Sequence, residues 1–202
     1  MYVQWCAKGL NGITDDEARS VMLGSQGLIC RWWRNVDPLP SNLIASKLTL
    51  RNLDWHVNRY SDYDPGTGQP FCEGSPFISL SAGTVEREVF LKSNIAHTAW
   101  QTALGFATDW GAVEGYVYIC YVIVALNSAV AVESVSEEVR ELKTYRRYSA
   151  YNPEGEIAAK IRVPANQIRL CMKLAADLTV SWTQVNPGFV APTPILNQRM
   201  FI

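Results

Sequence analysis

The sequence predicts an α+β protein in which strands outnumber helices. Hydrophobic residues make up 48% of the 202 residues and aromatic residues 11%, enough to bury a core within one domain. Segments rich in β-branched and aromatic residues do not alternate regularly with the helical ones, which favours α+β over a doubly wound sheet. Neither common spacing of a glycine-rich phosphate loop occurs, so no Rossmann or P-loop enzyme is expected.

The elements of the first third follow from capping residues and turn formers. Thr14 stands before an acidic first turn and begins a predicted helix that ends at a glycine. Residues 28–33 predict a strand, and a proline-containing turn then leads into a short helix near 43–48. Residues 61–70 are dense in turn formers and predict a loop.

Apolar spacing predicts the elements of the middle. Residues 75–83 predict a strand that runs into a turn, and 94–108 have the spacing of a helix. The stretch 115–126, "GYVYICYVIVAL", predicts a central strand buried on both faces. Residues 129–135 predict a further strand, and 137–142 a short turn of helix.

Two apolar stretches predict the late strands. They cover 156–163 and 168–174 and are joined by the turn at Pro164, as a hairpin or as a corner. Before them, 143–156 is a polar, tyrosine-rich loop. The tail after Ala176 packs as a sheet edge or hangs loose.

Charge and cysteine content limit the partners. The chain has 18 basic and 19 acidic residues, whereas a nucleic-acid binder usually carries a basic surplus, so nucleic acid is disfavoured. Its 5 cysteines lie far apart without a CxxC pair, which argues against a zinc site and leaves at least one free thiol. We expect no metal.

Neither a signal peptide nor a membrane span is expected. The N-terminus lacks a basic start followed by an apolar block. The longest apolar run, Val117–Leu126, is too short to cross a bilayer as a helix. We therefore expect a soluble protein, either cytoplasmic or a secreted or delivered effector domain.

Two polar pairs could carry chemistry. Glu154 and Glu156 flank Gly155 directly before a strand, so their carboxylates could converge on one ligand, although most such pairs are solvated loop residues. Ser79 and Ser81 share one face of their predicted strand, where a carboxylate could partner their hydroxyls, although most such pairs belong to a half-exposed strand.

Two further residue types complete the candidates. Arg34 follows two tryptophans at a predicted strand end, and a guanidinium held there suits a phosphate, with Arg31 as its rival. His56 is one of only 2 histidines, and a lone histidine is more often a structural hydrogen bonder than a catalyst.

In this order the features resemble the arginine–serine–glutamate signature of mono-ADP-ribosyltransferases, in particular the cholera toxin A and heat-labile enterotoxin A-like branch. The segments "WWRNVDPLPSNLI", "NLDWH", "FISLSAG" and "PEGEIAAKIRVPANQI" are similar to collinear blocks of that family, between about residues 29 and 170. Leu80 departs from the family's threonine. The first 25 or so residues are extra, and 177–202 form a C-terminal extension without a family counterpart.

The resemblance implies a single domain, 1–202, with two packed, mainly antiparallel sheets, a split NAD-binding cleft and peripheral helices. NAD is then a substrate, and no metal takes part. Glu156 stabilises the positive charge of the transition state and Ser79 orients it, with Ser81 also at the NAD site. Arg34 holds the NAD phosphates and the nicotinamide face, and His56 aligns the adenosine side or the ribose.

The resemblance also bears on the acceptor. Glu154 orients and deprotonates it, which points to an arginine of a protein, because a guanidinium needs a nearby base to become a nucleophile. The loop 144–152 carries acceptor recognition. The alternatives are an NAD glycohydrolase of the same fold, transfer to a nucleic-acid base, and a catalytically silent binding module.

Overall fold

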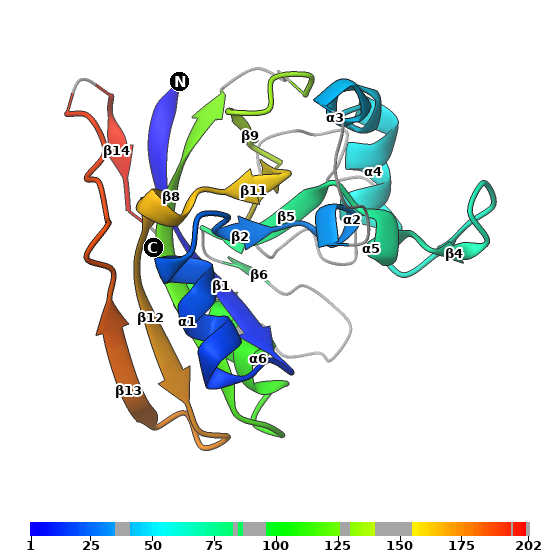
Figure 1. The fold of residues 1–202 in the computed structure, drawn as a ribbon. Helices are drawn as coiled ribbons and strands as arrows, with labels where there is room; N and C mark the ends of the chain where they lie inside the picture. The colour runs from blue at the N-terminus through cyan, green and yellow to red at the C-terminus, as the bar shows by residue number, and fades with distance from the viewer. Residues whose placement is uncertain are drawn as a thin grey trace.

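The computed structural model describes residues 1–34, 41–82, 85–86, 96–125, 130–139, 155–194 and 196–200. It confirms the α+β class: a large sheet with few helices, most of them on one side of the molecule (Figure 1).

The described elements, in chain order, are β1 Tyr2–Asn11, α1 Asp15–Leu23, β2 Leu28–Ile29, α2 Arg31–Arg34, α3 Ser41–Lys47, α4 Leu50–Asn58, β3 Tyr63–Asp64, β4 Gln69–Pro70, α5 Phe71–Gly74, β5 Phe77–Ser81, β6 Val85–Glu86, β7 Ala96–His97, α6 Ala99–Thr108, β8 Gly115–Ala125, β9 Ser136–Glu137, β10 Glu156–Lys160, β11 Arg162–Val163, the 3₁₀ helix η1 Ala165–Gln167, β12 Ile168–Leu174, β13 Val180–Val185 and β14 Gln198–Arg199.

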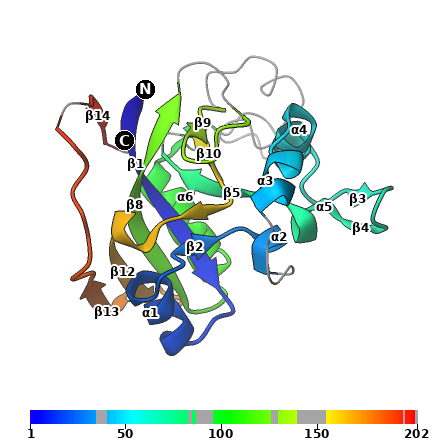
Figure 2. The same cartoon turned by 45° about the horizontal axis from the view of Figure 1, so that its top comes forward.

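The large sheet has the strand order β13-β12-β8-β9-β10-β5-β1-β14, with a further pairing of β8 with β1 (Figure 2). Its pairings are antiparallel except for β8 with β9 and β1 with β14. Starting from β8, each strand pairs with the next in the order β8, β9, β10, β5 and β1, and β1 pairs with β8 again. Two of these contacts are short: β5 meets β1 at the residue pair Ala7–Ser81, and β10 meets β9 at Ala158–Glu137. The mainly antiparallel arrangement is as expected, but the described strands form one eight-stranded sheet with three two-stranded ones and not two large packed sheets. The split NAD cleft remains a prediction.

β1 pairs with three strands of this sheet, β8, β5 and β14, so the N-terminal residues are not an appendage. It pairs with β8 along its whole length, from Tyr2 opposite Val124 to Asn11 opposite Gly115. The two faces of β1 are covered by different parts of the protein. The face of β1 that carries Tyr2 and Cys6 belongs to the main core, while the opposite face lies under α6 and the C-terminal segment.

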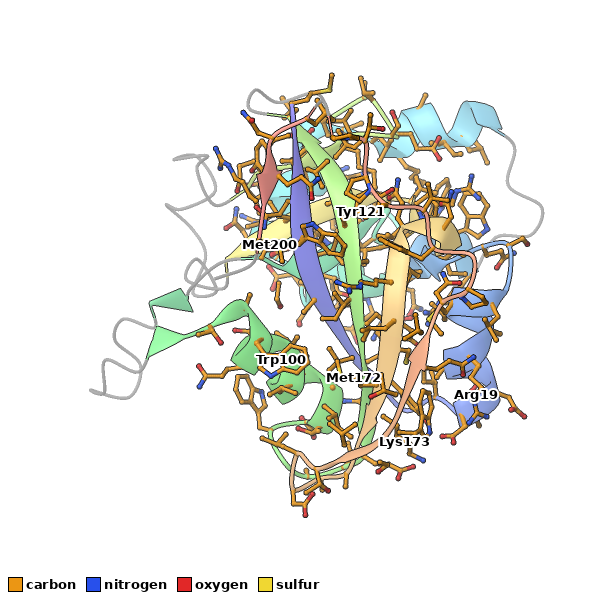
Figure 3. The ribbon with its side chains drawn as sticks, turned by 90° about the vertical axis from the view of Figure 1, so that its left-hand side faces the viewer. Arg19, Trp100, Tyr121, Met172, Lys173 and Met200 are labelled. Atoms are coloured by element: carbon orange, nitrogen blue, oxygen red, sulfur yellow. The ribbon has the colours of Figure 1, made fainter. Side chains whose placement is uncertain are left out.

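Helix α6 lies directly against β1, and this close approach requires a glycine at position 9. A Cβ at Gly9 would stand 2.1 Å from the carbonyl oxygen of Ala103, closer than real Cβ contacts come. Thr98 caps the helix and forms a capping box with Gln101. Figure 3 looks onto this side, where Trp100 of α6 lies close to the lower part of the sheet.

The C-terminal extension is built into the sheet. β13 pairs with β12 as an outer strand, and β14 pairs in parallel with β1 at the other end of the strand order. Between them, Phe189 packs against Trp5 and Tyr121, and the Tyr121 hydroxyl donates a hydrogen bond to the carbonyl of Val190 at 3.0 Å. Of the two expectations for the tail, packing as an edge is the one observed.

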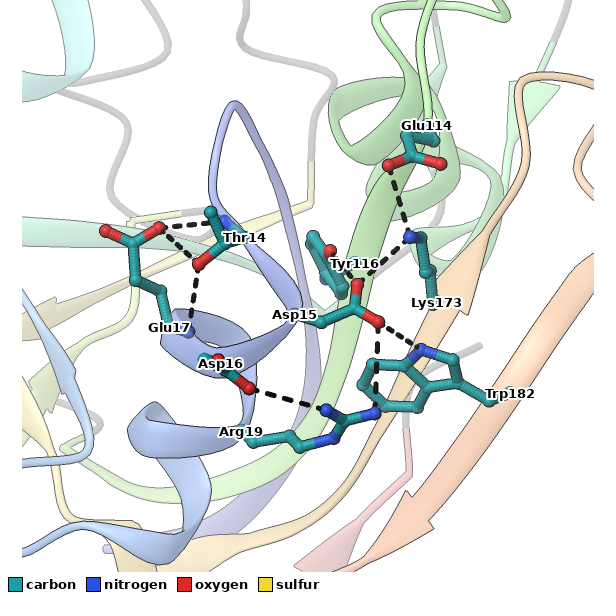
Figure 4. Close-up of polar contacts among 9 residues, drawn as sticks. All are labelled: Thr14, Asp15, Asp16, Glu17, Arg19, Glu114, Tyr116, Lys173 and Trp182. Carbon is teal, nitrogen blue, oxygen red and sulfur yellow. Dashed lines mark hydrogen bonds and ion pairs between the residues drawn. The ribbon is translucent and has the colours of Figure 1, made fainter.

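One polar cluster ties the extension to the N-terminal helix (Figure 4). The Asp15 carboxylate accepts hydrogen bonds from the Tyr116 hydroxyl at 2.6 Å, the Lys173 ammonium at 3.0 Å and the Trp182 indole at 3.2 Å. Arg19 lies over the Trp182 ring, with its guanidinium carbon 5.0 Å from the ring centroid. Hydrogen bonds, first from Tyr116 and then from Lys173, lower the pKa of Asp15 to about 2.

A buried ion pair joins β9 to β10. The Lys160 ammonium lies 2.8 Å from the Glu137 carboxylate, and the two side chains are 0% and 1% exposed. Lys160 also donates a hydrogen bond to the carbonyl of Val132. Next to this pair, the buried Glu138 accepts a hydrogen bond from the Tyr2 hydroxyl. Buried charged side chains therefore connect β9 with β10.

Several sequence predictions are confirmed. Thr14 caps α1 and forms a capping box with Glu17, and the helix ends at Gly24. α3 and the long strand β8 lie where they were expected, and β5 occupies the serine-containing strand. Of the helix predicted over 94–108, the later part is α6, whereas Ala96–His97 form the strand β7.

Other predictions are wrong in part. The strand predicted over 28–33 stops at Ile29, and the chain turns into α2, because β2 pairs only with the short β11. The predicted loop 61–70 contains the hairpin β3–β4. The described part of the strand predicted over 129–135 is turns, and Glu137 lies in β9 and not in a helix. Ser136 and Glu137 pair with the end of β8, so this strand edge is already occupied. The valines that precede Ser136 in the chain therefore have no strand with which to pair.

The two late strands form a corner and not a hairpin. β10 pairs with β5 and β9, whereas β12 pairs with β8 and β13. Ile161 has a φ of 60°, which breaks the extended chain between β10 and β11. In the described part of the chain, no helix is long and apolar enough to cross a membrane.

Candidate functional site

The candidate site forms where β10 begins. Glu156 is the first residue of β10 and lies opposite Ser81 of β5. The preceding Gly155 has a φ of 55°, a conformation that glycine adopts without strain, and its carbonyl accepts a hydrogen bond from the amide of Ala82. This backbone turn and strand pairing fix the position of the Glu156 carboxylate.

His56 lies between this carboxylate and the serine strand. Its Nε2 is 3.1 Å from Glu156 Oε1 and 3.1 Å from Ser79 Oγ, and its Nδ1 is 2.8 Å from Ser75 Oγ. His56 is only 3% exposed, and its imidazole makes an edge-to-face contact with the ring of Tyr60. A proton on Nε2 can therefore be donated to the Glu156 carboxylate.

Helix α4 brings His56 to this place. Thr49 caps the helix through a hydrogen bond from the amide of Asn52, and Leu53 is buried in the core one turn before His56. The imidazole also packs against Phe77 at the start of β5, with ring centroids 5.5 Å apart. A helix and two strands therefore meet at one histidine.

The surroundings of Glu156 favour its ionised form. Burial would raise the pKa of Glu156, but the hydrogen bond and charge of His56, the hydrogen bond of Ser79 and the charge of Lys8 together lower it. The result is a carboxylate that carries its negative charge inside the protein at neutral pH.

The two candidate arginines lie in α2 and differ in their neighbours. Arg31 makes an ion pair with Glu73, and its charge also acts on Tyr60, the ring next to His56. The charge of Arg34 acts on Glu17 at the start of α1. Both side chains are exposed. Of the two, Arg31 therefore lies toward the His56 side.

Lys8 is a charged residue of this region that the sequence did not single out. Burial lowers the pKa of Lys8, the charge of Glu156 acts in the opposite direction, and the charges of Arg31 and Arg34 lower it further. The side chain is half-buried. Its signal in the sequence is weak: one lysine inside the otherwise uncharged stretch 1–14.

The structure thus brings Glu156, Ser79 and His56 together, and it places Ser81 buried in the strand register opposite Glu156. Arg34 is not in contact with this group among the described residues. Glu154 and the predicted acceptor loop 144–152 lie outside the described residues.

Sequence reasoning also missed three supporting residues, Ser75, Tyr60 and Phe77. They become visible only when α4 packs on β5, and no motif marks them. Among the residues that the structure describes, no three histidine, cysteine, aspartate or glutamate side chains gather as metal ligands would.

The arrangement suits the stabilisation of positive charge. It holds an ionised carboxylate on a strand end with a fixed hydrogen-bond donor on one side, beside an arginine-bearing helix. Such a preorganised charge does not need to reorient when a cation develops in a reaction. The site therefore suits a reaction whose transition state is cationic.

Comparison with known proteins supports the fold. Neither a protein-family model nor a curated protein sequence matches the chain. Solved structures do: EcPltA matches with a TM-score of 0.54 and 10% identity, over 97% of this chain and 91% of the other. A mutant of E. coli heat-labile enterotoxin gives a TM-score of 0.48 at 14% identity, over 96% and 82% of the two chains.

The catalytic domain of the mosquitocidal toxin from Bacillus sphaericus matches with a TM-score of 0.42 and 12% identity, over 99% of this chain and 64% of the other. These neighbours are ADP-ribosyltransferase toxins, and the chain has a fold similar to that of EcPltA. The similarity to EcPltA spans β1 and the C-terminal segment as well as the residues 29–170 in which the sequence resemblance lies.

Proposed function

We propose that the protein is an NAD-dependent mono-ADP-ribosyltransferase whose transition-state carboxylate is Glu156. The observation that supports this most directly is the contact of Glu156 and Ser79 with one imidazole, His56. The three residues come from segments that are far apart in the sequence and that match the family pattern in order. The fold similarity to ADP-ribosyltransferase toxins supports the same reaction class.

In this reaction the bond between the ribose C1′ and the nicotinamide nitrogen breaks, and its electron pair leaves with nicotinamide. The ribose becomes cationic, and Glu156 stabilises this charge and accepts a hydrogen bond from the ribose 2′-hydroxyl. Ser79 and His56 hold the carboxylate in position and ionised. The acceptor then forms the new bond to C1′ with its own electron pair and loses a proton.

An arginine side chain of a protein is the acceptor that we propose. This part rests on Glu154, two residues before Glu156, as the base that takes the guanidinium proton. The heat-labile-enterotoxin-like branch and the delivery of the protein as a toxin or effector domain belong to the same proposal. An arginine of α2, Arg31 or Arg34, would hold the NAD phosphates.

The test is nicotinamide release from NAD, followed with and without an arginine analogue such as agmatine. We expect release by the wild type that the acceptor accelerates, and a loss of about a hundredfold or more in Glu156→Gln, since a fixed charge at a cationic centre is worth several kcal/mol. Glu133→Gln is a matched control, because Glu133 is an exposed acid in a turn.

The outcomes separate the alternatives. No release by the wild type with or without an acceptor would leave only a binding module. Release that ignores the acceptor and survives Glu154→Gln would make the protein an NAD glycohydrolase. Incorporation of ADP-ribose into oligonucleotides, and not into agmatine or proteins, would assign a nucleic-acid base as the acceptor.

A further inference from the structure

Ser75 is hydrogen-bonded to the second nitrogen of the His56 imidazole, the one that does not contact Glu156. Its Oγ lies 2.8 Å from Nδ1, and the residue is 1% exposed. The backbone fixes this position, because the Ser75 carbonyl accepts a hydrogen bond from the amide of Trp32 in α2 at 3.2 Å. Ser75 is therefore held between α5 and β5 and presents its hydroxyl to the buried ring.

The other nitrogen, Nε2, needs a proton for its contacts to be attractive. It lies 3.1 Å from Glu156 Oε1 and 3.1 Å from Ser79 Oγ. An ionised carboxylate can only accept hydrogen bonds, so a lone pair on Nε2 would repel it. Packing against the rings of Tyr60 and Phe77 sets the plane of the imidazole but does not decide which nitrogen is protonated. Hydrogen bonds to the two nitrogens decide it.

The Ser75 hydroxyl supplies what Nδ1 then requires. A neutral imidazole with its proton on Nε2 has a lone pair on Nδ1, and a buried acceptor without a donor is costly. Among the described residues the Ser75 Oγ has two partners, Nδ1 and the amide of Phe77, which donates to it at 3.3 Å. One lone pair of the oxygen accepts the amide proton, and the proton of the hydroxyl itself is directed to Nδ1.

We propose that Ser75 is a positioning residue that fixes the tautomer of His56. A chain of hydrogen bonds runs from the Phe77 amide to the Ser75 hydroxyl, from this hydroxyl to Nδ1, and from the Nε2 proton to the Glu156 carboxylate. Without the hydroxyl, the tautomer with its proton on Nδ1 becomes accessible, and it turns a lone pair toward Glu156. The effect on catalysis rests on the proposed function, whereas the hydrogen bonds do not.

Nitrogen-15 NMR of the imidazole nitrogens tests the tautomer without NAD. The chain contains only 2 histidines, so a spectrum of His97→Gln identifies the signals of His56. Spectra are recorded at about pH 8, above the range in which histidine ordinarily titrates. We expect the wild type to show a protonated Nε2 and an unprotonated Nδ1. Ser75→Ala should show a mixture of both tautomers, and Ser75→Thr, which keeps a hydroxyl, should restore the wild-type signals.

Nicotinamide release is the second measurement. Ser75→Ala should lower kcat about fivefold to tenfold, the fold-change that the loss of one hydrogen bond produces. The KM for NAD should stay within about twofold, because Ser75 acts through His56 and does not touch the substrate. Ser181→Ala is the matched control for the loss of a hydroxyl, since Ser181 is exposed on β13, and it should change neither measurement.

Three results would overturn the inference: a wild type with its proton on Nδ1 or on both nitrogens, a folded Ser75→Ala variant with wild-type signals, and mixed tautomers with an unchanged kcat. If thermal unfolding shows that Ser75→Ala is not folded, Ser75→Cys, a weaker donor of similar size, replaces it and should show the same mixture. A protein that releases no nicotinamide, but whose tautomer changes in Ser75→Ala, overturns the proposed function and leaves the role of Ser75 at His56 standing. The two failures are thereby distinguished.

Discussion

The buried ion pair between β9 and β10 allows a sharp prediction about stability. Lys160→Met keeps the length of the side chain but removes its charge, and the Glu137 carboxylate, 1% exposed, then lacks the cation that lies 2.8 Å away. Breaking a buried pair by removing one partner costs about 3–5 kcal/mol, because the remaining carboxylate loses the cation that offsets its burial. For a chain of 202 residues this corresponds to a fall in Tm of roughly 6–20 °C.

The double variant Lys160→Met with Glu137→Leu removes both charges. Apolar replacement of a whole buried pair is often neutral or stabilising, so this variant should recover most of the lost stability. The free energies of unfolding are measured in urea for the wild type, both single variants and the double variant, which closes a mutant cycle. A loss below about 1 kcal/mol in Lys160→Met, or strictly additive single effects, would refute the reasoning.

Three further predictions concern packing, pH and substrate binding. Gly9→Ala forces α6 away from β1, because the new methyl group meets the Ala103 carbonyl at 2.1 Å, and urea unfolding should report a loss of about 1–3 kcal/mol or more. Because its folded pKa of about 2 lies below the unfolded value, Asp15 stabilises the fold above pH 4 and loses this effect as the pH falls toward 2. The destabilisation caused by Asp15→Asn should therefore be full at pH 6 and shrink below pH 4. Finally, Arg31→Gln should raise the KM for NAD more than Arg34→Gln, because Arg31 lies toward the His56 side, and the reverse order would assign the NAD phosphates to Arg34.

The sequence predicts those elements whose signals are local. Thr14 and its acidic first turn predict α1 together with its cap, and the uninterrupted apolar run of β8 predicts a strand buried on both faces. β1 lacks such a signal, since a strand buried on both faces shows no alternation and Gln4 and Lys8 interrupt its apolar run. The valines before Ser136 have high β-propensity, but strand pairing decides, and the partner edge is occupied.

The candidate site follows the same rule. The types of Ser79 and Glu156 and their order in the chain point to one chemistry, and the structure brings both side chains to His56. The distances between them depend on how α4 packs on β5, which no local pattern encodes. The same holds for Lys160 and Glu137, whose burial as a pair results from the pairing of β9 with β10.

The pairing of β14 with β1 makes the two ends of the polypeptide one structural unit. Residues 177–202 were expected to be an addition to a core of 29–170, yet they cover Trp5 and Tyr121 and occupy the edge of β12. A shortened protein that ended at Ala176 would expose that aromatic surface and an open strand edge, both of which promote aggregation. Aggregation of such a protein would not show that the remaining core cannot fold. Its cause would be the loss of β14, the strand that pairs with β1, and of the residues that cover Trp5 and Tyr121.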